Sequence, residues 1–333
     1  MAKTSIKNYI MNLVAIILLY ALLKFFIANG VLSRYYIGII IFICINVVLA
    51  TSLNLATGFL GQLALGHAGF MAIGAYVSAI TAMSLRGSGM PPTLILIMSL
   101  LLAAIFAGVI GILIGIPALR LKGDYLGIIT LGFGEVIRVF INNIRMTGGA
   151  QGLTGIPRIS NIDNIFWITV IVVTILYTLT NSRHGRAIKS IREDEIAAEA
   201  VGIQTTKYKV MGFAIAAFFA GIGGGMYAHF IAFLDPNTFN FMRSVEILVI
   251  VVLGGMGSLT GSVIAAIVLT ILPEALRDFA NYRLLIYSGL LVVMMIFRPQ
   301  GLFGTTEFSL SGFLYKLRHN QFFSSRKNLE EGD

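Results

Sequence analysis

The sequence predicts an all-α polytopic membrane protein with about eight transmembrane helices and one further element that is broken or re-entrant. Of the 333 residues, 57% are apolar and only 12% are charged, whereas a soluble domain has about 25% charged residues. The charges are too few to cover a soluble surface of this size. The apolar segments have the length of membrane-spanning helices, and none shows the alternation typical of outer-membrane strands.

Nine apolar segments follow one another along the chain. They cover residues 9–29, 35–56, 63–85, 93–117, 124–142, 162–180, 210–234, 245–272 and 284–297. The first segment follows Lys3 and Lys7 and runs past Lys24 without a small-residue cleavage site. We therefore expect a retained first helix rather than a signal peptide.

The basic residues predict a cytoplasmic N-terminus, because Lys and Arg are enriched in cytoplasmic loops. With the N-terminus in the cytoplasm, each predicted span carries the chain to the other side of the membrane. Ten bases up to residue 209 then lie inside and four lie outside, namely Arg34, Arg86, Arg145 and Arg158.

The segment at 245–272 decides on which side the chain ends. It is long, and four glycines interrupt it between positions 254 and 261. A single crossing would leave the basic tail, residues 298–333, outside. Two short helices that turn back would leave this tail in the cytoplasm. We expect the second arrangement, because it agrees better with the enrichment of bases on the inner side.

The chain lacks the motifs of an enzyme. We find no P-loop, H-E-x-x-H, C-x-x-C or G-x-S-x-G motif, and the four histidines and single cysteine lack metal-ligand spacing. We expect no catalytic residue, no metal site and no bound cofactor on this chain. The net charge is +9, and the basic residues that produce it lie next to the predicted spans. We therefore expect them to contact membrane lipid and not nucleic acid.

Residues 181–209 form the longest polar segment between spans and are predicted to be a cytoplasmic loop. In its first part, bases recur every three residues, at Arg183, Arg186, Lys189 and Arg192. On a helix this spacing forms a basic stripe, which we expect to lie along the lipid headgroups.

The second part of this loop predicts a short helix with its own start and stop signals. Acidic residues favour a first turn, Ala favours the helix and Gly favours the position just past its end. The residues of this pattern are Glu193, Asp194, Glu195, Ala197, Ala198, Glu199, Ala200 and Gly202. The helix is either a docking element, whose small side chains admit a partner closely, or a solvated linker with ordinary caps.

Five motifs resemble the LivM-type permease of branched-chain amino acid ABC importers. They are G-x-x-G-Q-x-x-x-G-H-A-x-F at 58–70, L-x-L-K-G-D-Y-L-G-I-x-T-L-G-F-G-E-V-I-R at 119–138, T-G-G-x-x-G-L-x-G-I-P at 147–157, E-D-E-x-A-A-E-A-x-G-I at 193–203 and F-R-P-Q-G-L-F-G at 297–304. The resemblance covers residues 35–304 and implies a single transmembrane permease domain over residues 1–333.

The resemblance also implies partners in the cell inner membrane. These are a second permease of the LivH type, two ATPases of the LivG and LivF types, and a periplasmic or lipid-anchored binding protein. The ATPases would use ATP and magnesium, and segment 193–203 would couple this chain to them. The I-x-L-P ending of the general importer loop is absent, so its contact details do not carry over.

Two glycine clusters lie inside apolar segments. G-x-x-G-x-L occurs at 58–63 and again at 254–259. One interpretation is an internal repeat of broken helices whose backbone lines a substrate pathway, and the other is close packing through small residues. The pathway candidates in these clusters are Gly58, Gly61, Gln62, His67, Gly254 and Gly257.

Glu135 and Arg138 are also pathway candidates, since residues three apart share a helix face. A charge within the bilayer is costly, so we expect both side chains to point into the bundle and to pair. We favour a structural ion pair over contact with a zwitterionic substrate. His67 and His229 are isolated imidazoles, for which we favour structural hydrogen bonds.

The residues and the resemblance together predict a permease subunit of an ATP-driven importer for leucine, isoleucine or valine. Within the same class, urea or short amides are rival substrates. Outside it, the rivals are an ion-coupled secondary transporter, with Glu135 as its ion site, and a channel. No ring of charged residues that would line a channel is evident, which argues against the last.

Overall fold

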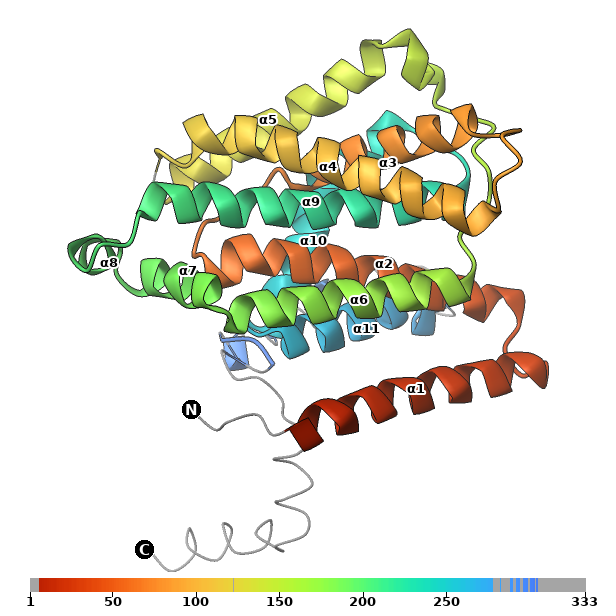
Figure 1. Ribbon diagram of the computed structural model, residues 1–333, viewed down its shortest axis with the longest axis horizontal. Coiled ribbons are helices and arrows are strands. Elements are labelled where there is room, and N and C mark those ends of the chain that lie inside the picture. Colours follow the sequence, from red (N-terminus) through yellow and green to blue (C-terminus); the bar gives the residue numbers. More distant parts are fainter. Residues whose placement is uncertain are drawn as a thin grey trace, which may run out of the picture. The chain divides into compact units, whose positions relative to one another are not determined.

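The computed structural model describes residues 6–121 and 123–277, and further residues 282, 288–289, 292–293, 296–298, 300–302 and 304. Within this part of the chain all regular elements are helices (Figure 1). The first are α1 (Ile6–Ala28), α2 (Arg34–Asn54), the π-helix η1 (Leu55–Phe59), α3 (His67–Ser84), α4 (Pro92–Ala118), α5 (Asp124–Asn143) and the 3₁₀ turns η2 (Arg145–Thr147) and η3 (Gly149–Gln151). They are followed by α6 (Ile162–Asn181), α7 (Arg183–Glu193), α8 (Glu195–Ala200), α9 (Thr205–Ile231), the 3₁₀ turn η4 (Pro236–Phe239), α10 (Phe241–Gly254) and α11 (Leu259–Ala275).

Among the residues that the structure describes, four helices are long and apolar enough to cross a membrane: α2 extended by η1, and α4, α6 and α9. They contain 20 to 27 residues, and a helix rises about 1.5 Å per residue, so each matches the hydrocarbon core. The chain is therefore an all-α membrane protein. The total of eight spans stays a prediction, and most of the segment at 284–297 lies outside the described residues.

Residues 39–305 form one compact unit, and α1 belongs to a separate unit. In the larger unit, α3, α4 and α9 run side by side (Figure 1). Small residues let these backbones approach: a Cβ added at Gly74 would lie 2.2 Å from the carbonyl oxygen of Gly221. A Cβ at Gly224 would lie 2.0 Å from that of Met71. Close packing of this kind stabilises helix pairs in membranes, where lipid competes with side chains for apolar contact.

The prediction of one helix over 63–85 is wrong in its first residues. The chain leaves α2 through η1, runs without helix from residue 60 to residue 66, and begins α3 at His67. Gly61 adopts a φ of +73°, a left-handed conformation that residues with a Cβ rarely take. The apolar pattern continues across this turn, which is why it resembled a helix.

The segment at 245–272 consists of two helices, α10 and α11, joined by residues 255–258. Gly255 and Gly257 have φ values of +110° and +94°, so both positions strongly favour glycine. The two helices are closest at Gly254, where an added Cβ would lie 2.6 Å from the carbonyl carbon of Gly261.

The side-chain contacts of α2 fix the course of this helix pair. Near the start of α10, Arg243 contacts Asn46, and near the end of α11, Thr270 contacts the same residue. The connecting turn contacts Asn54, eight residues further along α2, through Gly257. The chain therefore runs from Asn46 toward Asn54 along α2 in α10 and returns toward Asn46 in α11. The segment is thus two short helices that turn back, as expected from the sequence.

The segments that follow α5 and α9 are paired with each other. Leu153 and Leu234 form an isolated antiparallel bridge, with N···O distances of 2.8 and 3.1 Å. Nearby, the imidazole of His229 lies 3.1 Å from the carbonyl oxygen of Pro157 and 2.9 Å from the hydroxyl of Ser78. These hydrogen bonds give His229 a structural role.

Candidate functional site

The two glycine clusters, about 200 residues apart in sequence, lie against each other at the end of α2. Asn54 is fully buried, and its Nδ2 donates to the carbonyl oxygen of Ser258 at 2.8 Å and to the hydroxyl of Ser262 at 2.8 Å. Its Oδ1 accepts from the backbone N–H of Gly257 at 2.9 Å. One buried amide thus satisfies the polar backbone that the break between α10 and α11 exposes.

Gly58 brings the two breaks into direct contact. A Cβ added at Gly58 would lie 2.4 Å from the backbone nitrogen of Gly257. This distance is far inside van der Waals contact with backbone atoms that a rotamer change cannot move. Two of the six glycine-cluster candidates from the sequence therefore lie together, one from each break.

The last residue of the basic stripe reaches both breaks. The guanidinium of Arg192 donates through Nη1 to the carbonyl oxygen of Gly58 at 2.6 Å, and the carbonyl oxygen of Met256 lies 3.5 Å away. Gly61 faces the aliphatic part of the same side chain, since an added Cβ would lie 3.0 Å from its Cγ. We refer to Asn54, Gly58, Arg192, Met256 and Gly257 as the glycine junction.

Sequence reasoning did not find the glycine junction. The sequence predicts Arg192 on a stripe facing lipid headgroups, leaves the glycines open between a pathway and close packing, and indicates no link between them. The structure divides the stripe: Arg183 and Arg186 are exposed, while Lys189 lies 5.2 Å from the centre of the Phe59 ring and Arg192 enters the junction. A cation over an aromatic ring is a favourable contact, so half of the stripe packs on the end of α2.

The segment predicted to dock a partner is α8 with its flanking residues. Asp194 caps its first turn, because Oδ1 accepts from the backbone N–H groups of Ile196 and Ala197 at 2.9 and 3.0 Å. At the other end, Gly202 has a φ of +86°, and the N–H of Ile203 bonds to the carbonyl of Ala198 at 3.0 Å. This is the Schellman arrangement, so Gly202 lies just past the helix end as the sequence predicts. Of the acidic residues expected in the first turn, only Glu195 lies there, because Glu193 ends α7 and Asp194 is the N-cap.

Two contacts tie α8 to the start of α9. Lys209, whose side chain is only 4% exposed, lies 2.7 Å from the carboxylate of Glu195. The hydroxyl of Thr205 donates to Glu199 at 2.6 Å. These contacts hold the short helix α8 against the start of α9.

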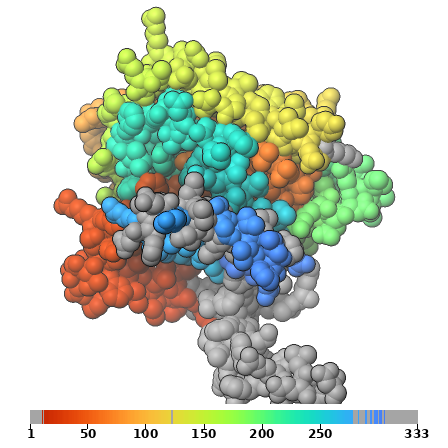
Figure 2. Space-filling view, turned by 180° about the vertical axis from the view of Figure 1, so that it is seen from behind, coloured from red at the N-terminus to blue at the C-terminus, as the bar shows by residue number. Residues whose placement is uncertain are grey.

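The outer surface of α8 is apolar at several positions. Ile196 and Val201 are each 78% exposed, and Ala197 and Ala200 are also exposed, whereas Ala198 is buried. Glu193, the last residue of α7, is exposed beside them. In the space-filling view the α8 segment (green) lies at the edge of the molecule (Figure 2). Ile196 on α8 and Val201 just after it thus expose two large apolar side chains within six residues, which is typical of a contact surface.

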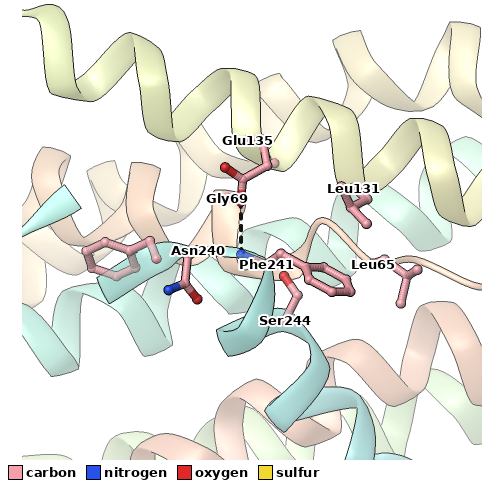
Figure 3. A pocket seen from close by; sticks show the side chains of 9 residues that line it. Leu65, Gly69, Leu131, Glu135, Asn240, Phe241 and Ser244 are labelled. Atoms are coloured by element: carbon pink, nitrogen blue, oxygen red, sulfur yellow. Dashed lines mark hydrogen bonds between the residues drawn. The ribbon is translucent and has the colours of Figure 1, made fainter. Parts of the chain in front are cut away.

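The predicted pair of Glu135 and Arg138 forms, with an Nε···Oε2 distance of 2.7 Å. Glu135 also accepts from the backbone N–H of Phe241 at 2.9 Å, which is the dashed contact in Figure 3. Arg138 donates to Asn237 at 3.0 Å. The pair therefore joins α5 to η4 and to the first turn of α10.

The pocket beside Glu135 is too small for a substrate. Leu65, Leu131 and Ser244 line it with Glu135 (Figure 3), and it leaves no room for a water-sized molecule. The ion pair fits the structural interpretation that the sequence favours.

The remaining pathway candidates have local partners. His67 is buried, and its Nε2 lies 2.9 Å from the hydroxyl of Ser52. Gln62 is partly exposed, and its backbone N–H bonds to the carbonyl of Ala56 at 2.9 Å. Gly254 packs on Gly261 as described. Neither polar side chain lies at the glycine junction.

Comparison with known proteins gives one family. Residues 35–298 match the family described as "Branched-chain amino acid transport system / permease component". The high-affinity branched-chain amino acid transport system permease protein LivM of Salmonella typhimurium is 36% identical over 310 residues, which is 83% of this chain and 71% of that protein. The LivM protein of Escherichia coli K12 has the same identity and coverage.

More distant relatives belong to the second permease type. The protein LivH of Salmonella typhimurium is 24% identical over 283 residues, which is 78% of this chain and 91% of LivH. No solved structure matches. With the match over most of its length and the all-α membrane architecture, the chain belongs to the family of branched-chain amino acid transport system permease components.

Proposed function

We propose that the chain is the transmembrane permease subunit of an ATP-binding cassette importer, which moves branched-chain amino acids across the inner membrane by alternating access. Support comes from the family and from the substrate class named for the relatives at 36% identity. The complex would contain a second, LivH-type permease, LivG- and LivF-type ATPases that use ATP and magnesium, and a periplasmic or lipid-anchored binding protein.

The observation that carries the mechanism is the hydrogen bond from Arg192 to Gly58, at the point where both broken elements meet. A charge-assisted hydrogen bond is about twice as strong as a neutral one. Segment 193–203 follows Arg192 directly, so a displacement of α8 by an ATPase reaches the ends of α2 and α10 through one side chain. Segment 193–203 is thereby the coupling element, and its displacement moves the glycine junction.

The exposed face of α8 is the proposed contact with the ATPase. Ile196 and Val201 project from it, and Ala197 and Ala200 leave space between them for a partner side chain. The acidic Glu193 and Asp194 lie at one end, where basic residues of the partner can pair with them. The ties through Glu195 and Glu199 pass the force on to α9 as well.

The same contacts support the proposed topology. Residues 181–209 would form the cytoplasmic coupling loop, and the turn between α10 and α11 contacts Arg192 of that loop. A turn on the cytoplasmic side places the start of α10 and the end of α11 toward the outside. One further crossing then brings the tail, residues 298–333, to the cytoplasm, where the N-terminus also lies.

The experiment uses the complete importer in inside-out and right-side-out vesicles and follows radiolabelled L-leucine. Uptake that stops on ATP depletion and survives an uncoupler at constant ATP is the expected result. Uptake that an uncoupler abolishes at constant ATP would instead identify an ion-coupled transporter. Competition by urea or acetamide, with none by isoleucine or valine, would refute the substrate class alone.

A further inference from the structure

A second cavity lies away from the glycine junction, between α2, α9, α10 and α11. Its volume is about 800 Å³, within the range of about 300–1,000 Å³ of small-molecule sites. Its wall is mostly apolar, with Phe42, Ile250 and Leu269 among the lining residues. The charged residues Arg243, Glu246 and Glu274 also line it, and none of them was singled out from the sequence as a site residue.

A hydrogen bond to α2 and an ion pair with Glu246 hold the guanidinium of Arg243 in place. Arg243 donates through Nη2 to Oδ1 of the buried Asn46 at 2.9 Å, and Asn46 in turn donates to the hydroxyl of Thr270 at 2.9 Å. The Nη1 group of Arg243 contacts Glu246 at 2.8 Å. The Arg243 side chain is 19% exposed and that of Glu246 is 56% exposed, so the acid is the freer member of the pair.

We propose that this cleft binds the transported molecule as an α-amino acid with an apolar side chain. The guanidinium of Arg243 receives the carboxylate, Glu246 turns from Arg243 to the ammonium group, and the side chain lies against the apolar wall. This inference rests on the proposed function and names the site at which the substrate is held within the membrane.

The pair of Arg243 and Glu246 favours a zwitterion. A ligand with one charge would leave one member of this pair without its partner in a partly desolvated cleft. Glu274 adds a second carboxylate to the lining of the cleft. A zwitterion replaces the ion pair within the protein by two new ones, carboxylate to Arg243 and ammonium to Glu246. A guanidinium binds a carboxylate in a planar, bidentate manner. An apolar ligand such as an acyl chain would satisfy neither group.

The position of the cleft links it to the glycine junction through one helix. Arg243 and Glu246 lie in the first turns of α10, and Gly254 ends the same helix beside the junction. Eleven residues of helix separate Arg243 from Gly254, which is about 16 Å. A displacement of Arg192 that moves α10 therefore also moves Arg243 and Glu246, with no other element in between.

The test measures substrate protection in the complete importer reconstituted in liposomes. Cys44 is replaced by Ser, and Met242→Cys places a reactive thiol in the cleft, which Met242 lines. The rate of labelling by a charged thiol reagent is measured with and without L-leucine. The matched control is Met146→Cys, an exposed residue that does not line the cleft. ATP-driven leucine uptake by each thiol variant is recorded in parallel.

L-leucine is expected to slow labelling at residue 242 and not at 146. Isoamylamine and isocaproate, which lack the carboxylate and the ammonium group respectively, should protect weakly. In Arg243→Gln, half-maximal protection should need about tenfold more leucine, the effect of losing one charged hydrogen bond. The control Arg86→Gln, which alters an exposed arginine outside the cleft, should leave protection unchanged.

Three outcomes would overturn the site. Labelling at residue 242 that leucine does not slow, in a variant that still takes up leucine, places the substrate elsewhere. Protection by phosphatidylethanolamine and not by leucine makes the cleft a lipid site. Equal protection by leucine and isoamylamine removes the role of Arg243. If the unmodified importer takes up no leucine, the proposed function itself is refuted. This outcome is distinguishable from failure of the site, in which uptake persists without protection.

Discussion

The guanidinium of Arg192 on α7 donates a hydrogen bond of 2.6 Å to the carbonyl oxygen of Gly58, which lies 134 residues earlier in the chain. Arg192 ends the basic stripe of the segment 181–209, and Gly58 lies within the π-helix that terminates α2. The contact connects the segment proposed to meet the ATPases with the two places where membrane helices are broken.

The first prediction concerns Arg192 itself. Arg192→Gln should lower ATP-driven leucine uptake about tenfold, because a hydrogen bond to a charged group contributes about 1.5–3 kcal/mol. Arg192→Lys should be intermediate, since an ammonium group donates to one carbonyl and lacks the planar fork. The control Arg183→Gln changes an exposed member of the same stripe. Uptake near the unmodified level in both Arg192 variants, with equal protein in the membrane, would contradict this role.

Gly202 tests whether the shape of α8 matters. Its φ of +86° is unfavourable for residues with a Cβ, although an added Cβ would meet no neighbour. Gly202→Leu should therefore cost about 1–2 kcal/mol through backbone conformation alone and lower uptake. Asn is the other residue that tolerates this conformation, so Gly202→Asn should retain most of the uptake. Equal uptake by the two variants would show that the α8 terminus does not matter.

A third prediction concerns packing at the glycine junction. Gly58→Ala should destabilise the solubilised complex by about 1–3 kcal/mol, since the new methyl group overlaps Asn54 and the backbone of Gly257. Gly132→Ala is the matched control in α5, because nothing lies within 4 Å of the added Cβ. Thermal unfolding of both variants, followed by static light scattering, gives the comparison. An unchanged midpoint for Gly58→Ala would refute the close approach of the two breaks.

The ion pair between Glu195 and Lys209 yields a prediction by double substitution. Glu195→Ala alone should lower uptake strongly, because it leaves the nearly buried ammonium group of Lys209 without that carboxylate. Adding Lys209→Met removes this charge and should restore part of the uptake. Single and double variants that lose uptake equally would show that the charge of Lys209 has another task.

Glu135 separates the structural pair from an ion-binding role. Glu135→Gln keeps an oxygen that accepts from the backbone of Phe241, so we expect at least half of the ATP-driven uptake to remain. Glu135→Leu removes this acceptor and should lower both uptake and thermal stability. Complete loss of uptake in Glu135→Gln, with normal stability, would favour the ion-coupled transporter.

Much of the fold follows from local patterns in the sequence. Long apolar runs predicted α4, α6 and α9 to within a few residues, because a spanning helix needs only length and apolarity. The limits of α8 were also predicted, since Asp194 and Gly202 act on the neighbouring backbone alone. The break at 60–66 was one of two interpretations of its glycines, because glycines in an apolar run look the same in a packed helix and in a break.

The relationships at the site could not be predicted in this way. Asn54 is one polar residue in an apolar run, and nothing near it in sequence indicates that it contacts Ser258 and Gly257. Arg192 has the spacing of a lipid-facing stripe, and its direction depends on where α7 lies against α2. Arg243 and Glu246 in the cleft passed unnoticed because Asn46, the partner of Arg243, lies 197 residues away from it in the sequence.

The measurement that tests coupling most directly is the stimulation of ATP hydrolysis by the leucine-loaded binding protein in the complete reconstituted importer. The signal must pass from the outer face through the glycine junction to α8 and the ATPases. We expect Arg192→Gln to retain basal hydrolysis and assembly but to lose this stimulation, while Arg183→Gln keeps it. Full stimulation in Arg192→Gln would contradict the proposed route through Arg192 and Gly58.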